Sequence, residues 1–529
     1  MKPMVIGVSF LYGCFFVFTM TSHSKIHEKR WFILGIMSLS LIIVMLNNVT
    51  LNVALPELSK DLGADNTELQ WIVDSYALIF GGTLLVMGAL GDRFGRKKAL
   101  QAGLILVGIA SLNAGLYSNS TREIIFARAT MGFGAALVMP ATLSIVIVVF
   151  PPEERGKAIG IWTMMAGIGA PIGLLVGGWA VENYNWQMVF LINIPFIILA
   201  LISGYILVPD SKDIQNRPLD PYGAILSILA LGLILYAIIE APIIGWTSLK
   251  FFIVVILGII LTYSFIRWER RIDFPMLPIN FFNSTGFSLG LVSISLASFV
   301  MFSFMFTQML HFQLIRDHSA FEAAVRFLFL PLGLMPAAAS SDALSKKYGS
   351  NNIVSFGLFL ISVAMGIFTT VETDTEYYRL AFIFFLLGFG IGLTLAPSTT
   401  IVMDSIPEDK AGVGSATNDA SREIGGALGI AIGGSILNEV YQRNMKIPEE
   451  LSDSLGNLPM ESFPSAIRIG SDLLNEGNIL GLELIQNAKL AFMEGMIMSA
   501  KVMGLIALIS AILVKLYMPT SIINDGVDS

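Results

Sequence analysis

Long apolar stretches separated by short polar loops dominate the chain. A helix that crosses a bilayer needs about 20 mostly apolar residues. The stretches do not alternate between apolar and polar positions, as the strands of a membrane β-barrel would. The pattern therefore predicts an all-α polytopic membrane protein with fourteen spans, at 31–54, 69–90, 98–117, 124–148, 157–181, 188–208, 222–241, 251–267, 286–309, 323–341, 351–370, 379–403, 413–437 and 493–515.

The composition excludes several classes of protein. Of 529 residues, 55% are hydrophobic and 13% are charged, whereas a soluble domain carries about 25% charged residues. A net charge of −7 without a basic run argues against a nucleic-acid partner. Cys14 is the only cysteine and the four histidines are scattered, so we expect no metal site and no cofactor.

A further apolar stretch between Met4 and Met20 precedes the first predicted span. It has three interpretations: an additional helix, a signal-like segment, or an extension ahead of a start at Met20. Signal peptides carry their positive charge before the apolar run, and here only Lys2 does so. We therefore interpret residues 1–30 as a dispensable N-terminal extension, with an extra helix as the alternative.

Positive charge in the short loops predicts the orientation, because Lys and Arg concentrate in cytoplasmic loops. If residues 21–30 lie inside and the loops alternate, the inside loops hold 18 Lys and Arg residues and the outside loops hold 8. We therefore expect a protein of the inner or plasma membrane, with both ends of the fourteen-span core in the cytoplasm. The long outside loop 441–485 is polar and acidic, and we expect it to be partly ordered.

The sequence repeats itself weakly at a nearly constant offset. The matching pieces are 256, 255 and 254 residues apart: Gly132-Phe133-Gly134 with Gly388-Phe389-Gly390, Pro152-Glu153-Glu154-Arg155 with Pro407-Glu408-Asp409-Lys410, and Arg93-Phe94-Gly95 with Lys347-Tyr348-Gly349. The alternative is that unrelated turns converged on Pro and Gly. Two parallel copies displaced by eight spans would be six-helix bundles separated by two inserted helices, an arrangement typical of transporters with a midplane site.

This repeat predicts the domain organisation. The proposed units are an N-terminal extension 1–30, a six-helix bundle 31–208, two inserted helices 209–280, a second six-helix bundle 281–515 that carries the outer loop 441–485, and a cytoplasmic tail 516–529.

The loop between spans 2 and 3 reads Gly-Ala-Leu-Gly-Asp-Arg-Phe-Gly-Arg-Lys-Lys over residues 88–98. Its glycines permit a sharp turn and close helix approach. Asp92 can cap the following helix and pair with a cation from a neighbouring helix. We therefore predict a cytoplasmic gate that can hold one conformation closed, with an ordinary basic loop as the alternative. Its residues are Gly88, Asp92, Arg93, Gly95 and Arg96.

The spacing of this loop resembles the signature of the major facilitator superfamily. Residues 46–56, 70–76 and 415–425 resemble further motifs of its fourteen-span drug:proton antiporter branch, and the resemblance covers about 31–515. The chain is most similar in these motifs to exporters of quaternary ammonium compounds and methyl viologen. The resemblance implies the major facilitator fold and proton-driven drug efflux.

Charged residues within spans are candidates for the transport chemistry, because burying them in lipid is costly. An enclosed carboxylate can take up a proton near neutral pH and, when ionised, attract a lipophilic cation. Competition between proton and cation would give antiport, although structural ion pairs of Arg128 with Asp74 and of Arg422 with Glu423 are alternatives. Arg128 lies near the outer end of its span, where its side chain can reach the membrane surface. The candidates for proton coupling and the substrate cavity are Asp74, Glu423, Arg128, Asn47 and Arg422.

Asn47 departs from the resembling family, which usually has aspartate there. An amide cannot carry a proton, but it can hydrogen-bond a substrate or a carboxylate. The departure leaves the proton stoichiometry and the preference for divalent cations open.

Span 5 resembles the antiporter motif G-x-x-x-G-P-x-x-G-G, with Leu174 in place of the proline. Glycine at every fourth residue gives a smooth face for close helix packing. The resemblance associates this face with antiport direction, and a purely structural interface is the alternative. The antiporter-like face consists of Gly169, Gly173, Gly177 and Gly178.

These observations predict a proton-driven multidrug exporter of amphipathic, cationic compounds. Its partners would be lipophilic small molecules, protons and the lipid bilayer, and we expect a monomer. The chain lacks a G-x-x-x-x-G-K-[ST] phosphate loop, and no nucleophile–base set suggests an enzyme. The alternatives are an exporter of one endogenous metabolite or lipid precursor, and a membrane sensor that does not transport.

Overall fold

The structure, a computed structural model, describes residues 29–519 apart from 63–65, 213–219, 274, 276, 317, 457 and 462. Across these residues the chain is helical and contains no strand. Fourteen helical segments are long and apolar enough to cross a membrane, which confirms the predicted fold class and number of spans. The predictions for residues 1–28 and 520–529 lie outside the described residues.

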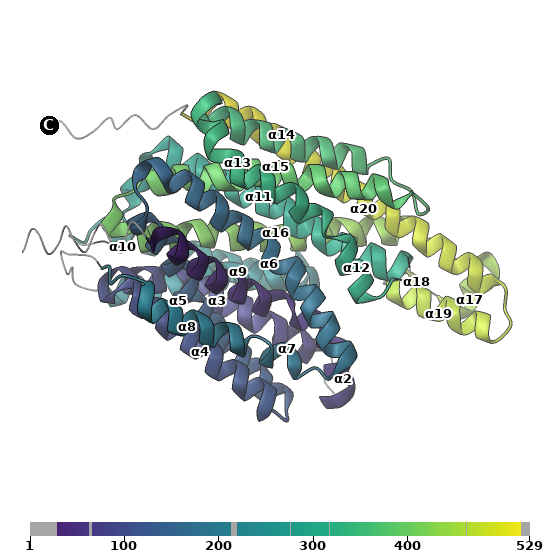
Figure 1. Cartoon of the computed structure of the whole chain (residues 1–529). Coiled ribbons are helices and arrows are strands. Elements are labelled where there is room, and N and C mark those ends of the chain that lie inside the picture. The colour runs from purple at the N-terminus through teal and green to yellow at the C-terminus, as the bar shows by residue number, and fades with distance from the viewer. Residues whose placement is uncertain are drawn as a thin grey trace, which may run out of the picture.

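The first half of the chain forms the lower part of the view in Figure 1. A helix at Lys29–Val49 comes first. It is followed by α2 (Leu51–Leu62), α3 (Asn66–Phe94), α4 (Arg96–Leu116), α5 (Thr121–Val149), α6 (Pro152–Asn183), α7 (Met188–Leu191) and α8 (Ile194–Leu207). Helix α5 packs against both α3 and α4.

The second half forms the upper part of the same view. Its bundle is built from α11 (Thr285–Leu310), α12 (Ala320–Arg326), α13 (Phe329–Tyr348), α14 (Ser350–Phe368), α15 (Tyr377–Asp404), α16 (Ala411–Asn444) and α20 (Leu480–Tyr517). Short helices η1 (Ile279–Asn283), η2 (His311–Ile315) and η3 (Glu408–Lys410) join these elements. Helix α15 packs against α13 and α14, as α5 does against α3 and α4.

Two glycine contacts show that the halves repeat one packing scheme. A Cβ atom at Gly103 of α4 would lie 2.6 Å from the carbonyl oxygen of Gly134 on α5. At Gly357 of α14 it would lie 2.7 Å from the carbonyl oxygen of Gly390 on α15. Each pair lets two helix backbones meet without side chains between them. The equivalent turns also match, with φ of 113° at Gly95 and 87° at Gly349.

The two inserted helices, α9 (Pro221–Ile244) and α10 (Leu249–Glu269), lie between the bundles in sequence. Helix α9 contacts α3 of the first half and α16 of the second. Trp246, just after α9, donates a hydrogen bond of 2.7 Å to Ser435 Oγ on α16. Helix α10 packs on α9, and few of its residues are buried. The inserted pair therefore covers one side of the junction between the halves.

The predicted loop 441–485 contains the helices α17 (Glu449–Leu455), α18 (Leu458–Glu461) and α19 (Phe463–Asn475). Helix α19 packs beside the N-terminal part of α20, and α18 packs against α19 (Figure 1). The last span was expected to begin at residue 493, whereas α20 begins at Leu480. At 1.5 Å per residue a helix of 38 residues is about 57 Å long. Because a hydrocarbon core is about 30 Å thick, α20 continues well beyond the membrane into this partly ordered loop.

Candidate functional site

The two halves meet closely at the end where α3 turns into α4, which we call the closed end. A Cβ atom at Gly88 would lie 2.5 Å from the carbonyl oxygen of Gly412 and 2.7 Å from Cβ of Ala416. Glycine at both 88 and 412 thus permits α3 and α16 to touch through their backbones. From this end the halves diverge towards the right of Figure 1.

Asp92 is the central residue of the closed end, and 4% of it is exposed. Its carboxylate accepts hydrogen bonds from the backbone N–H groups of Gly412 (2.9 Å) and Val413 (3.1 Å) at the start of α16. Arg96 Nε donates at 2.9 Å, and Nη2 of the same residue lies 2.8 Å from the carboxylate. A buried carboxylate is costly without such partners, and here two backbone donors and a guanidinium offset that cost.

This arrangement corrects one part of the prediction. Asp92 was expected to cap the following helix and to find its cation on a neighbouring one. The N-cap residue of α4 is Gly95, which makes no side-chain cap, and Asp92 caps α16 of the other half instead. Its cation, Arg96, is on α4, the helix next to α3 in the chain. The sequence could not reveal this because the capped helix begins far away in the chain.

Further contacts join the two halves at the closed end. Arg96 Nη2 donates a hydrogen bond of 2.7 Å to the carbonyl oxygen of Glu408, and Arg155 forms an ion pair with the Glu408 carboxylate. Arg93, the remaining gate candidate, stacks its guanidinium over Phe94 at 5.5 Å. On the other side of the junction, Lys346 donates to the carbonyl oxygen of Glu153 at 2.7 Å.

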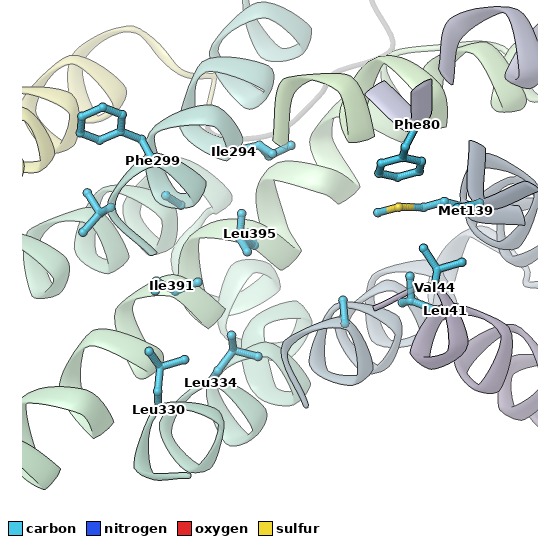
Figure 2. Packing of buried hydrophobic residues seen from close by; sticks show 14 of the residues in the cluster. Leu41, Val44, Phe80, Met139, Ile294, Phe299, Leu330, Leu334, Ile391 and Leu395 are labelled. Atoms are coloured by element: carbon cyan, nitrogen blue, oxygen red, sulfur yellow. The ribbon is translucent and has the colours of Figure 1, made fainter. Parts of the chain in front are cut away.

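A cavity lies between the two halves, away from the closed end. Both halves line it, and most of the lining is apolar. Its wall consists of Met45, Asn48 and Val49 of the first helix; Thr163, Ala166, Gly167 and Pro171 of α6; Met301, Phe302 and Met305 of α11; and Phe327, Leu330, Leu334, Leu395, Arg422 and Glu423. Figure 2 shows three of these lining residues, Leu330, Leu334 and Leu395, within the buried hydrophobic cluster. Leu41 and Val44 of the first helix, on the right of the view, belong to the same cluster and do not line the cavity.

The charged part of the cavity wall comes from α16. Arg422 and Glu423 line the cavity, and the Arg422 guanidinium lies 5.4 Å from the Trp162 ring of α6. One turn earlier, Asp419 is fully buried, and its Oδ1 accepts a hydrogen bond of 3.1 Å from Asn418. Asp419 Oδ2 has no hydrogen-bond partner among the described residues. Asp419 and Glu423 both interact electrostatically with Arg422, so two acids share one cation.

Asp419 was not among the predicted site residues. The signal was available, because Asp419 and Glu423 are four residues apart and therefore lie on neighbouring turns of one helix. Its lack of a side-chain cation other than Arg422 could only be seen in the structure.

A second polar cluster lies within the first half. Arg128 of α5 is 1% exposed and donates hydrogen bonds to the backbone oxygens of Ile72 (3.1 Å) and Asn47 (2.5 Å). Its guanidinium also lies 4.4 Å from the Tyr76 ring. The expectation that Arg128 reaches the membrane surface is therefore wrong, because backbone acceptors on two other helices hold it inside the bundle. Sequence reasoning did not identify Tyr76.

Asn47 belongs to this second cluster and is not part of the cavity wall. Its Nδ2 donates to the carbonyl oxygen of Ile43 at 2.8 Å, and its Oδ1 accepts from Asn193 at 3.3 Å. Asn193 is fully buried and was also not predicted. The structure thus separates the five candidates: Arg422 and Glu423 share the cavity, while Asn47 and Arg128 contact each other. Asp74 lies on α3, and its side chain is outside the described residues.

The glycine face of α6 packs mainly against the first helix. A Cβ atom at Gly169, Gly173 or Gly177 would lie 2.6 Å from a side-chain carbon of Met45, Val49 or Thr50, respectively. Gly178 instead faces Phe321 of α12, with 3.6 Å to its Cβ. Leu174, which stands where the motif has proline, is buried, and α6 remains continuous.

Comparison with known proteins agrees with this architecture. A family model described as Major Facilitator Superfamily matches residues 37–430. The chain is 27% identical to the multidrug efflux pump LfrA of Mycolicibacterium smegmatis, covering 93% of this chain and 97% of that protein. It is 30% identical to the methyl viologen resistance protein SmvA of Salmonella typhimurium, covering 84% and 90%.

A solved structure gives the same fold at lower identity. The crystal structure of the human organic anion transporter MFSD10 superposes with a TM-score of 0.59 at 12% identity, covering 92% of this chain and 99% of that one. With the helix count, the repeated bundles and the family match together, the chain belongs to the Major Facilitator Superfamily and is a multi-pass membrane transporter of small molecules rather than an enzyme.

Proposed function

We propose that this protein is a proton-driven exporter of amphipathic cations in the inner or plasma membrane. The observation that carries the proposal is the composition of the cavity wall, where Glu423 is the only acid among the described lining residues, most of which are apolar. Flexible methionine and flat phenylalanine side chains can adapt to ligands of different shape. The curated relatives are multidrug efflux and resistance proteins, which supports a drug substrate.

The charge balance on α16 supports competition between a proton and a cation. With Asp419 and Glu423 ionised and Arg422 protonated, the three residues carry a net charge of −1, which attracts a cation. One proton on the acid pair brings the net charge to zero and removes that attraction. Asp74 of α3 is a further proton carrier in this proposal, on the strength of its position in the sequence.

The distribution of Lys and Arg supports a cytoplasmic position for the closed end. The described conformation would then face outward, with the cytoplasmic side held shut by Asp92. Release of a proton and breakage of the Asp92 contacts would belong to the step that reopens the cavity inward.

The test is export of a cationic dye from vesicles with an imposed pH gradient. The wild-type protein should export the dye until an ionophore collapses the gradient. Glu423→Gln should lose uphill export, because it removes the acid that the described residues contribute to the cavity wall. The matched control is Glu240→Gln, since Glu240 is a half-buried acid of α9 that does not line the cavity.

Export that persists after the gradient is collapsed would contradict proton drive. Equal export by wild type and Glu423→Gln would contradict the role of Glu423. Protection by the wild-type protein against a single compound, with no effect on unrelated cationic dyes, would favour an exporter of one endogenous metabolite or lipid precursor.

A further inference from the structure

A groove outside the central cavity opens on the surface of the second half, between α14 and α20. Its wall is mostly apolar and includes Phe356, Phe359, Leu508 and Ile512. Phe356 is 49% exposed and Ile512 is 53% exposed. Both helices are membrane spans, so this wall faces acyl chains.

The two helices are fixed to each other beneath the groove. Ser355 Oγ donates a hydrogen bond of 2.7 Å to the carbonyl oxygen of Ala511, and both residues line the groove. Because this bond holds α14 against α20, the groove is a defined shape rather than a gap between loosely packed helices.

One end of the groove is polar and positively charged. Lys515 and Asn352 line it there and contact each other through Nζ and Oδ1. Asn352 Nδ2 in turn donates to the carbonyl oxygen of Tyr348 at 2.6 Å, and Lys347 Nζ lies 5.0 Å from the Tyr348 ring. No acidic residue is found among the described residues of the groove wall.

The start of α14 adds to this positive end. Gly349 is the N-cap residue and makes no side-chain cap, so the first backbone N–H groups of α14 are not satisfied by a capping side chain. A helix N-terminus carries a partial positive charge and favours anions. Lys515 and Asn352, which belongs to the first turn of α14, therefore lie together at the positive end of the groove.

We propose that this groove binds one acidic phospholipid from the leaflet at the closed end. The phosphate would lie beside Lys515 and the start of α14, and an acyl chain would follow the apolar wall. From Lys515 to Leu508 the groove runs about 10 Å along α20, at 1.5 Å per residue. Basic pockets between membrane helices at the cytoplasmic surface are suited to anionic headgroups.

The experiment measures lipid retained by the purified full-length protein. Delipidated protein is mixed with equal amounts of dioleoylphosphatidylglycerol and dioleoylphosphatidylcholine, and bound lipid is counted by native mass spectrometry. The wild-type protein should retain one phosphatidylglycerol in preference to phosphatidylcholine. Lys515→Gln should reduce that preference about fivefold, which is the effect of one lysine near an anionic headgroup. Lys501→Gln is the matched control, because Lys501 is an exposed lysine of α20 that does not line the groove.

A second pair of variants tests the apolar wall. Ile512→Trp should obstruct the groove and lower retention of phosphatidylglycerol. Ile509→Trp should leave it unchanged, since Ile509 is 49% exposed on the same helix but does not line the groove. Equal retention of the two lipids by the wild-type protein would overturn the proposal. Unchanged retention by both Lys515→Gln and Ile512→Trp would do so as well.

Discussion

Asp92 and Gly412 are 320 residues apart in the chain, yet the backbone N–H of Gly412 donates a hydrogen bond of 2.9 Å to the Asp92 carboxylate. The acid stands at the end of α3, and the donor stands at the start of α16. A negative charge at a helix N-terminus is stabilised by the unpaired N–H groups and the helix dipole. One side chain of the first half thus completes a helix of the second, which favours the conformation in which the halves touch.

We expect Asp92→Asn to weaken the closed end without unfolding the protein. The amide keeps one acceptor oxygen but loses the negative charge that pairs with Arg96 and stabilises the start of α16. From the usual cost of a lost cap and a broken buried pair, we expect about 2 kcal/mol against the closed arrangement, or roughly a thirtyfold change in the conformational equilibrium. Spin labels at Lys98 and Lys347, exposed positions on the two halves, would report a longer distance at this end.

The control for this variant is Glu153→Gln, which removes an exposed acid at the same end. It should leave the distance distribution and the transport rate unchanged. A wild-type distance distribution in Asp92→Asn, together with wild-type transport, would show that Asp92 does not set the conformational equilibrium.

Gly88 and Gly91 provide a matched test of backbone contact. Gly88→Ala would place a methyl group 2.5 Å from the carbonyl oxygen of Gly412, whereas at Gly91 the nearest atom, Cβ of Ala99, is 3.5 Å away. Overpacking of this kind typically costs about 2 kcal/mol, so we expect Gly88→Ala to slow transport about tenfold or more. Gly91→Ala should be tolerated. Similar transport by the two variants in the vesicle assay would contradict a direct contact of α3 with α16.

Local properties of the sequence were sufficient for the fold. Hydropathy over about 20 residues is a local quantity, and it predicted all fourteen spans. It failed at the start of α20, where Glu483, Lys489 and Glu494 interrupt the apolar pattern although the helix continues. Those charges mark the point where the helix leaves the membrane, and hydropathy cannot distinguish a helix outside the membrane from a loop.

The site was less accessible from the sequence, because partners depend on rotation about a helix axis and on contacts between distant segments. Asn47 and Asn48 are adjacent in the chain, but successive residues of a helix point about 100° apart. Only Asn48 lines the cavity, while the side chain of Asn47 contacts Asn193 inside the first half. A motif match identifies the helix that carries function, and packing decides which of its residues faces the cavity.

The orientation of the protein in the membrane can be tested with its cysteine content. Cys14 is the only cysteine, so a Cys14→Ser protein provides a background without thiols. Lys98→Cys at the closed end and Glu476→Cys beyond α19 are both exposed positions. In intact cells, a maleimide that cannot cross the membrane should label the cysteine at 476 and not the one at 98. Labelling at 98 alone would reverse the proposed orientation, and labelling at both would contradict the odd number of spans between them.

The two asparagines also provide a test of charge selectivity. Asn48→Asp would add a second acid to a cavity whose wall contains Glu423, so preference should shift from monovalent towards divalent cations. Asn47→Asp would place its charge outside the cavity wall, on a side chain that contacts Asn193. The new carboxylate would add no charge to the cavity wall, so the substrate preference should remain that of the wild type.

The measurement is export of a matched monovalent and divalent cation pair by wild type, Asn47→Asp and Asn48→Asp in the same vesicle assay. We expect the ratio of divalent to monovalent export to rise only in Asn48→Asp. A shift in Asn47→Asp with none in Asn48→Asp would contradict this expectation. It would mean that position 47 sets the charge preference from outside the cavity and that the cavity wall does not. The pair is informative because both variants add one carboxylate to the same helix, one residue apart. Any difference between them therefore reports on the direction of the side chain rather than on the total charge of the protein.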